Sequence, residues 1–348
     1  MLIHQIKNKL SSSQYFNTVF KNKKIGLAVS GGVDSMVMLD IFCKISREYN
    51  LKLYVMHYNH KWRKKSYIDA ELVKKYCQKN KIRFLYKENK GQVFSAKGVR
   101  HRTDPPGRRS ASGGKNEEIA RNERYSFFEQ CAKKFSLKVV CTAHHRDDQL
   151  ETVLFRLARG TGPNGLYPIK EFRELPGGMK ISGPLLDLWK KDIFNYALKN
   201  KVSYREDKTN LDVTYKRNLI RRKILPLLKK INPEVENNIL AFSDLAYSQY
   251  VALNTYFSLL LKKIKIGSPL TLNRNKFLKL DYYTQTAFIY WFFTLHGIKG
   301  AVSKINVIRD AIINQKKVDL SKKYIMNVVK DKIIFYIKSE VRHDMKSY

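Results

Sequence analysis

The sequence predicts an α/β fold with a doubly wound parallel sheet, followed by a smaller, mostly helical domain. Two observations point to the sheet: short apolar runs alternate with helical stretches in the first part of the chain, and a Gly-Gly turn directly follows the first run. The third observation is a change of pattern after Asp212, where long segments carry apolar side chains at helical spacing. We therefore expect two domains, residues 1–209 and residues 210–348.

Four apolar runs are the expected strands of the sheet. They are Ile25–Val29, Leu53–Met56, Ile82–Tyr86 and Leu137–Cys141. Helical sequence separates each run from the next, which is typical of a Rossmann-like parallel sheet with helices on both faces.

The second domain is expected to be built mainly from helices. Glu234–Ile264 and Tyr283–Leu295 carry aliphatic and aromatic residues at helical spacing, which most simply form a core. The tail Val318–Ile337 alternates in places and is expected to form a short terminal hairpin.

The turn behind the first strand predicts an anion site. Its sequence is Ser30-Gly31-Gly32-Val33-Asp34-Ser35, and an apolar helix is expected to follow at once. Such a turn points backbone N–H groups and the positive end of a helix at an anion. No Gly-Lys-Ser or Gly-Lys-Thr follows, so the loop is not of the Walker A type. Taken alone, the turn could also be purely structural.

A second polar segment, Thr142–Thr152, follows the fourth apolar run, Leu137–Cys141. Asp147, Asp148 and Glu151 lie three or four residues apart on the expected helix, so their carboxylates crowd onto neighbouring faces. Magnesium bound together with phosphates would offset that repulsion, because this ion prefers oxygen ligands. The alternative is that these acids only complement the helix dipole.

These segments, with four others, carry a family resemblance. The others are Asn116–Tyr125, Arg156–Leu166, His57–His60 with Arg63, Ser66 and Asp69, and Asp207–Asn210 followed by Tyr215–Arg221. In this order they resemble the tRNA-isoleucine lysidine synthetases of the PP-loop, or N-type ATP pyrophosphatase, superfamily. The resemblance runs from about Lys23 to about Pro233. Larger members carry an additional carboxyl-terminal domain for which this chain has little room.

The resemblance implies a two-step reaction on an isoleucine tRNA with a CAU anticodon. ATP first adenylates the wobble cytidine and releases pyrophosphate; the side-chain amine of free L-lysine then displaces AMP and leaves lysidine. The expected cofactors are ATP and Mg²⁺. Alternatives are another PP-loop enzyme that amidates a small acid or modifies tRNA, and a catalytically inactive basic RNA-binding protein. The four cysteines lie at least ten residues apart, which does not favour the cysteine-dependent, sulfur-inserting members.

The resemblance also implies residue roles. Ser30, Gly31, Gly32, Val33, Asp34 and Ser35 would hold pyrophosphate; Asp34, Arg124, His144 and Asp148 would be catalytic; Asp34 and Asp148 would bind the metal; Arg159, Arg217 and Arg221 are candidates for RNA contacts. Arg124 would neutralise charge at the α-phosphate, and Asp148 or His144 would take the proton of the lysine amine. The three RNA candidates could equally be surface charges or partners in internal ion pairs.

The composition favours a polyanionic partner. The chain has 67 Lys and Arg against 30 Asp and Glu, a formal charge of +37 over 348 residues. Residues 92–114 form an expected flexible, basic insertion, which is either a tolerated loop or an arm that touches tRNA. No signal peptide and no apolar run of membrane length is present, which predicts no membrane association and a bacterial cytoplasm or a plastid stroma as the compartment. Whether the protein forms a homodimer stays open.

Overall fold

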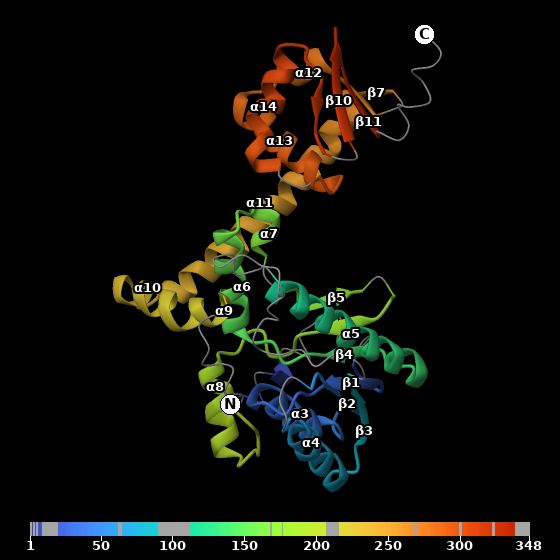
Figure 1. Ribbon diagram of the computed structural model, residues 1–348, viewed down its shortest axis with the longest axis vertical. Coiled ribbons are helices and arrows are strands. Elements are labelled where there is room, and N and C mark those ends of the chain that lie inside the picture. Colours follow the sequence, from blue (N-terminus) through green and yellow to red (C-terminus); the bar gives the residue numbers. More distant parts are fainter. Residues whose placement is uncertain are drawn as a thin grey trace, which may run out of the picture. The chain divides into compact units, whose positions relative to one another are not determined.

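The computed structural model describes residues 2, 4, 6–8, 20–61, 65–89, 112–167, 169–175, 177–206, 216–267, 270–298, 301–321 and 324–337. The chain divides into two compact units (Figure 1). Unit 1 comprises residues 1–155 and 168–240, and unit 2 comprises residues 156–167 and 241–348. No helix among these described residues is long and apolar enough to cross a membrane.

Unit 1 is built around a six-stranded sheet in the order β3-β2-β1-β4-β6-β5. All neighbours pair in parallel except β5, which is antiparallel to β6 at the edge. The strands are β1 (Lys24–Ala28), β2 (Lys52–Asn59), β3 (Arg83–Glu88), β4 (Val139–Cys141), β5 (Phe172–Glu174) and β6 (Lys180–Ser182). The predicted α/β fold and its four strands are confirmed, while β5 and β6 were not anticipated.

The helices of unit 1 are α3 (Val33–Ile45), α4 (Tyr67–Lys79), α5 (Ser112–Phe135), α6 (Arg146–Ala158), α8 (Lys190–Lys199), α9 (Lys216–Leu219), the π-helix η2 (Ile220–Ile224) and α10 (Leu225–Ile231). The helices from α3 to α6 alternate with the strands, α6 ending in unit 2, and the remaining helices of unit 1 follow β6. Of the predicted insertion 92–114, only 112–114 falls in the described residues, as the start of α5. The remainder lies outside them, as does the motif Asp207–Asn210.

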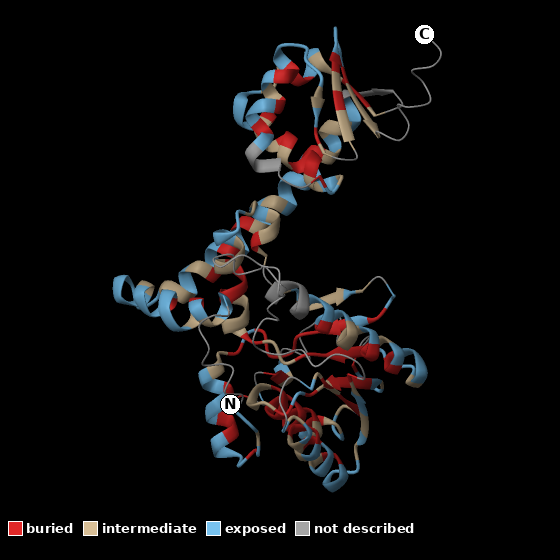
Figure 2. Ribbon diagram, viewed as in Figure 1, coloured by how far each residue is buried: buried red, intermediate tan, exposed pale blue. Residues whose placement is uncertain are grey.

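The central strands are buried on both faces, as their apolar sequences require (Figure 2). In β2, Leu53 and Val55 pack with helices α3, α4 and α8 in one core, whereas Tyr54 and Met56 pack with α5 in another. This division follows from the two-residue period of a strand. On the face of the sheet covered by α5, Gly26 leaves space for the Met56 side chain. A Cβ atom at position 26 would lie only 2.6 Å from Met56 Cε.

One buried carboxylate connects three helices of unit 1. Asp40 on α3 accepts hydrogen bonds from Tyr76 of α4 at 2.9 Å and from Tyr196 of α8 at 2.7 Å, and it pairs with Lys44 at 2.8 Å. Burial raises the pKa of both tyrosine hydroxyls, and the Asp40 charge raises it further, so both remain donors. The helix behind the Gly-Gly turn is thus fixed to α8.

Unit 2 combines helices with a five-stranded sheet in the order β7-β8-β11-β10-β9. Its strands are β7 (Lys265–Gly267), β8 (Thr271–Asn273), β9 (Val318–Asp319), β10 (Tyr324–Val329) and β11 (Lys332–Ile337), and its helices are α7 (Pro163–Leu166), α11 (Val235–Ile264, beginning in unit 1), α12 (Arg274–Leu278), α13 (Tyr282–Leu295) and α14 (Ala301–Ile313). The predicted helices correspond to α11 and α13. The expected terminal hairpin is β10–β11, and β7 to β9 extend it to a full sheet.

Candidate functional site

The Gly-Gly turn connects β1 to α3 at the carboxyl edge of the sheet. Gly31 adopts φ +94°, a conformation that favours glycine, and a Cβ there would lie 3.2 Å from Cβ of Asp69. Gly32 precedes the first helical residue and provides no side-chain cap, so the first N–H groups of α3 are not capped by a side chain there. Ser35 Oγ accepts hydrogen bonds from the backbone N–H groups of Ser30 at 3.1 Å and Gly31 at 3.2 Å. The turn therefore has the backbone of a phosphate-binding loop.

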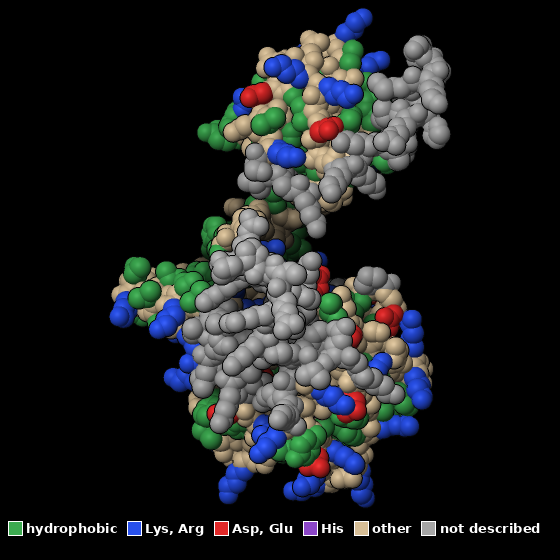
Figure 3. Space-filling model, viewed as in Figure 1, with side chains coloured by type: hydrophobic (Ala, Val, Ile, Leu, Met, Phe, Trp, Pro, Cys, Tyr) green, Lys and Arg blue, Asp and Glu red, His purple; other side chains and the backbone are tan. Residues whose placement is uncertain are grey.

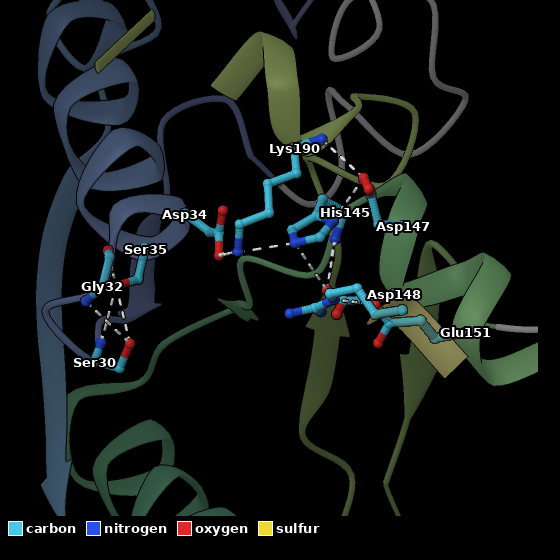
Figure 4. Close-up of polar contacts among 10 residues, drawn as sticks. Ser30, Gly32, Asp34, Ser35, His145, Asp147, Asp148, Glu151 and Lys190 are labelled. Carbon is cyan, nitrogen blue, oxygen red and sulfur yellow. Dashed lines mark hydrogen bonds and ion pairs between the residues drawn. The ribbon is translucent and has the colours of Figure 1, made fainter. Parts of the chain in front are cut away.

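Three carboxylates surround the His145 side chain beside this turn (Figure 4). His145 Nε2 lies 3.7 Å from Asp34 Oδ2 and 3.6 Å from Asp148 Oδ2, and Nδ1 lies 3.3 Å from Asp147 Oδ2 without hydrogen-bond geometry. Asp34 is in the first turn of α3, and the two other acids are in the first turn of α6. The carboxyl ends of the adjacent parallel strands β1 and β4 lead into these two helices.

The acidic surroundings favour the charged form of His145. Its side chain is 2% exposed, and burial alone would lower its pKa, but the carboxylates of Asp147, Asp148 and Asp34 raise it overall. Burial would raise the pKa of Asp147, but the proximity of His145 and the backbone N–H of Lys190, which donates at 2.8 Å, lower it overall. In its charged form, which these carboxylates favour, His145 would offset part of their negative charge.

Lys190 supplies a second cation to the same group. It is the first residue of α8, and its Nζ lies 3.3 Å from Asp34 Oδ2. The other carboxylate oxygen of Asp34, Oδ1, is buried and has no hydrogen-bond partner within the described residues. An unsatisfied buried carboxylate oxygen fits a cation ligand. Within the described ranges no three acidic, histidine or cysteine side chains form a metal site from protein groups alone.

His144 interacts through charge with both Asp148 and Arg124. Burial lowers the pKa of His144 to about 4, the charges of Arg173, Arg124 and Arg121 lower it as well, and Asp148 opposes them. His144 is therefore neutral at pH 7, and its Nδ1 lies 3.0 Å from Thr142 Oγ1. Since His144 interacts with both Asp148 and Arg124, the four predicted catalytic residues belong to one continuous group in unit 1.

The three predicted RNA contacts occupy different environments. Arg221 Nε donates to Glu151 Oε1 at 2.6 Å, and Glu151 is 1% exposed, so Arg221 belongs to an internal ion pair. Burial raises the pKa of Glu151, although Arg221 by itself lowers it. The π-helix η2 carries Arg221, and the N–H of Leu225 donates to the carbonyl of Ile220 five residues earlier.

Arg217 and Arg159 are both exposed. Arg217 lies one turn before Arg221 and contributes a weaker charge interaction to Glu151. Arg159 belongs to unit 2. On the face drawn in Figure 3, Lys and Arg side chains are spread over both units rather than gathered into one stripe.

Two cationic residues that contact Asp34, Asp147 and Asp148 were not among the site residues predicted from the sequence. The family resemblance selects His144, and nothing in the sequence pattern singles out its neighbour His145. Lys190 had no signal near the other site residues, since it is 42 positions after Asp148 in the chain. It reaches them because β6 pairs with β4, which brings the start of α8 to the same edge of the sheet.

Comparison with known proteins adds the following. The family described as "PP-loop domain" matches residues 3–228. The chain is 37% identical over 229 residues to the tRNA(Ile)-lysidine synthase of Thermosipho africanus, covering 66% of this chain and 49% of the relative. It is 35% identical over 234 residues to the tRNA(Ile)-lysidine synthase of Petrotoga mobilis, covering 66% and 67%. The chain thus spans about half the length of the Thermosipho relative and two thirds of the Petrotoga one.

A solved structure shares the fold. The U34-tRNA thiolase of Methanococcus maripaludis, with its [4Fe-4S] cluster, aligns with a TM-score of 0.55 at 15% identity, covering 71% of this chain and 78% of the thiolase. At this identity the similarity concerns the fold alone.

Proposed function

Since the chain belongs to the PP-loop family, among the tRNA(Ile)-lysidine synthases, we propose that it uses ATP to join free L-lysine to the wobble cytidine of an isoleucine tRNA with a CAU anticodon. One observation supports this most directly. The turn Ser30–Ser35 contributes Asp34, which is linked through His145 to Asp148 at the carboxyl edge of the sheet. Asp148 in turn interacts with His144, and His144 with Arg124. Binding RNA alone would need no such arrangement.

In the first step, the carbonyl oxygen of the cytosine attacks the α-phosphorus of ATP and pyrophosphate leaves. The backbone N–H groups of Ser30–Ser35 and the N-terminus of α3 would hold the leaving pyrophosphate. Arg124 would stabilise the charge that develops at the α-phosphate, because a guanidinium group offers several fixed donors to phosphate oxygens.

In the second step, the side-chain amine of lysine displaces AMP from the modified cytosine. The amine is nucleophilic only when neutral, and its ordinary pKa is about 10.4, so the site must remove a proton. We assign this role to Asp148, whose Oδ2 lies 3.6 Å from His145 Nε2 and whose charge acts on His144. His144, which is neutral at pH 7, would relay that proton or hold the adenylated base.

The residues present fit a magnesium ion. This ion typically uses one or two protein carboxylates together with phosphate oxygens. Asp34, with its unpartnered Oδ1, and Asp148 would be those ligands. When bound, Mg²⁺ would neutralise phosphate charge. His145 and Lys190 would limit the repulsion among the carboxylates.

An RNA substrate also fits the charge of +37, which a polyanion would neutralise. We keep Arg159, Arg217 and Arg221 as proposed RNA contacts, with Arg221 acting from within its ion pair. The domain division at 209/210, a homodimer and the choice between bacterial cytoplasm and plastid stroma stay predictions; the relatives named above are bacterial.

The deciding experiment is an incubation with ATP, Mg²⁺, labelled lysine and unmodified isoleucine tRNA bearing CAU. We expect label in the tRNA, and we expect Asp148→Asn to abolish the label while tRNA affinity stays within about twofold, because the substitution removes a proton acceptor and not a cation. Asp192→Asn is the matched control, because this exposed acid lies in the first turn of α8 and forms no part of the acidic group.

Two outcomes would contradict the proposal. Near-normal turnover by Asp148→Asn would remove the assignment of Asp148. Pyrophosphate release with a small acid and without tRNA would favour another PP-loop enzyme class.

A further inference from the structure

Three arginines of unit 1 gather around one tyrosine ring. Arg121, Arg124 and Arg173 have their guanidinium carbons 4.8, 5.7 and 5.4 Å from the ring centroid of Tyr125. Arg173 also donates a hydrogen bond to the Tyr125 hydroxyl. Two of the arginines lie on α5, three residues apart, and the third comes from the edge strand β5. We call Arg121, Arg124 and Arg173 the arginine cluster.

Among the described residues, the arginine cluster has no carboxylate counterpart. Within the described parts of the chain, none of the three arginines forms an ion pair with a carboxylate. Burial lowers the pKa of Arg124; Tyr125 opposes this, and the charges of Arg121 and Arg173 lower the pKa further. The cation–π contacts with the Tyr125 ring offset only part of the repulsion among the three positive charges. An arrangement of this kind is stable when an anion binds it.

The surroundings of the cluster narrow the choice of anion. Neutral His144 is close enough to all three arginines and to Asp148 for their charges to act on it. The cluster and the carboxylates of Asp148, Asp34 and Asp147 therefore form one site with a positive part and a negative part. In the proposed function, ATP and its magnesium ion would use Arg124, Asp34 and Asp148, which leaves Arg121 and Arg173 available for a second anion. A free amino acid with a cationic side chain carries a carboxylate for one part and ammonium groups for the other.

We propose that Arg121 and Arg173 bind the α-carboxylate of the free amino-acid substrate, leaving Arg124 to face the α-phosphate. The inference rests on the proposed function and adds the group that selects a free amino acid over a simple amine. A planar guanidinium donates two parallel hydrogen bonds to a carboxylate. With the carboxylate held there, the side-chain amine is free to reach Asp148.

The test combines substitutions in the protein with one in the substrate. L-Lysinamide keeps both amines of lysine and replaces the carboxylate by a neutral amide. We expect wild-type protein to prefer lysine to lysinamide in kcat/KM for transfer to tRNA. Arg121→Gln and Arg173→Gln should each lower kcat/KM for lysine by about 10- to 100-fold, the usual effect of losing a hydrogen bond to a charged group. Both variants should leave lysinamide transfer nearly unchanged, so the preference for lysine collapses.

Three further measurements complete the design. The affinity for tRNA and the tRNA-dependent release of pyrophosphate should not change in either variant. Arg47→Gln is the matched control, since this exposed arginine is remote from the cluster in sequence and removes the same charge. Arg173→Lys keeps the charge and the fold but loses the planar donor pair, so it should show the same selective loss to a smaller degree.

Other outcomes would overturn the inference. Equal losses for lysine and lysinamide would mean that the cluster only supports the local structure. A weaker tRNA affinity with a smaller salt dependence would assign the cluster to an RNA phosphate, and loss of pyrophosphate release would assign it to ATP. If wild-type protein transferred neither substrate, the proposed function itself would fail, and the substrate inferred from it would fail too.

Discussion

Replacement of Arg221 by methionine would isolate the energetics of the buried Glu151 carboxylate. Glu151 is 1% exposed, and its Oε1 accepts from Arg221 Nε at 2.6 Å. Removing one partner of a buried ion pair typically costs about 3–5 kcal/mol, because the remaining charge is left without compensation. The Arg221 side chain is 31% exposed, which places the expected loss near the lower end, at about 3 kcal/mol at pH 7.5.

The sign of the pH dependence follows from the pKa of Glu151. Burial already raises this pKa above its usual value, and without Arg221 it should rise further. A carboxyl group whose pKa is raised in the folded state costs stability only when it is ionised. The cost is therefore absent below the unfolded pKa of about 4.5 and grows as the pH rises toward the folded value. The difference from wild type should shrink to about 1 kcal/mol at pH 4.5, the contribution of an ordinary hydrogen bond.

Urea unfolding at pH 7.5 and at pH 4.5 would measure both values. The double variant Glu151→Gln with Arg221→Met should recover to within about 1 kcal/mol of wild type, since neither charge is then buried. Arg217→Met removes the same charge from an exposed position and should change stability by less than about 0.5 kcal/mol. Equal destabilisation of Arg221→Met at both pH values would refute the ion-pair reasoning.

Three other predictions concern the turn, the neutral histidine and the helix contacts of unit 1. Gly31→Ala should cost about 1–2 kcal/mol and weaken ATP binding, because φ +94° strains any other residue; urea unfolding and ATP titration would show it, and an unchanged affinity would contradict it. Between pH 6.5 and pH 4, the free energy of unfolding of wild type should fall by up to about 3 kcal/mol relative to His144→Asn. The reason is that the histidine is protonated in the unfolded state but stays neutral in the folded state, where its pKa is about 4. An equal pH dependence of the two proteins would disprove the neutral assignment. Tyr196→Phe should cost about 1 kcal/mol through the lost hydrogen bond to Asp40, measured against the exposed control Tyr67→Phe, and equal effects would contradict it.

The sequence was sufficient for the parts of the fold that local pattern determines. The strands β1, β2 and β4 are apolar runs because they are buried in the middle of the sheet, while the edge strand β3 is only partly buried; the turn after β1 has glycine where φ is positive. The three-residue strands β5 and β6 gave no such signal, because only tertiary pairing makes Phe172–Glu174 and Lys180–Ser182 extended.

In the candidate site too, some residues can be identified from local sequence pattern and others only from the tertiary structure. Asp34 and Asp148 could be selected because each follows a recognisable strand and begins a helix. Their convergence with Lys190 and Arg173 depends on β6 pairing with β4 and on β5 pairing with β6, which local pattern does not reveal. His145 contacts the acids through the geometry at the start of α6, where its backbone N–H also donates to Asp148 Oδ2 at 3.1 Å; His144 stays the predicted catalytic histidine.

The Ser35 hydroxyl accepts hydrogen bonds within the turn Ser30–Ser35 that we propose for phosphate binding. By accepting from the N–H groups of Ser30 and Gly31 it occupies donors that an incoming phosphate would need. In the proposed reaction, a phosphate oxygen would replace the Ser35 hydroxyl as the acceptor for these two N–H groups. Ser35 therefore fixes the backbone next to Gly31, where φ is positive, through hydrogen bonds within the protein.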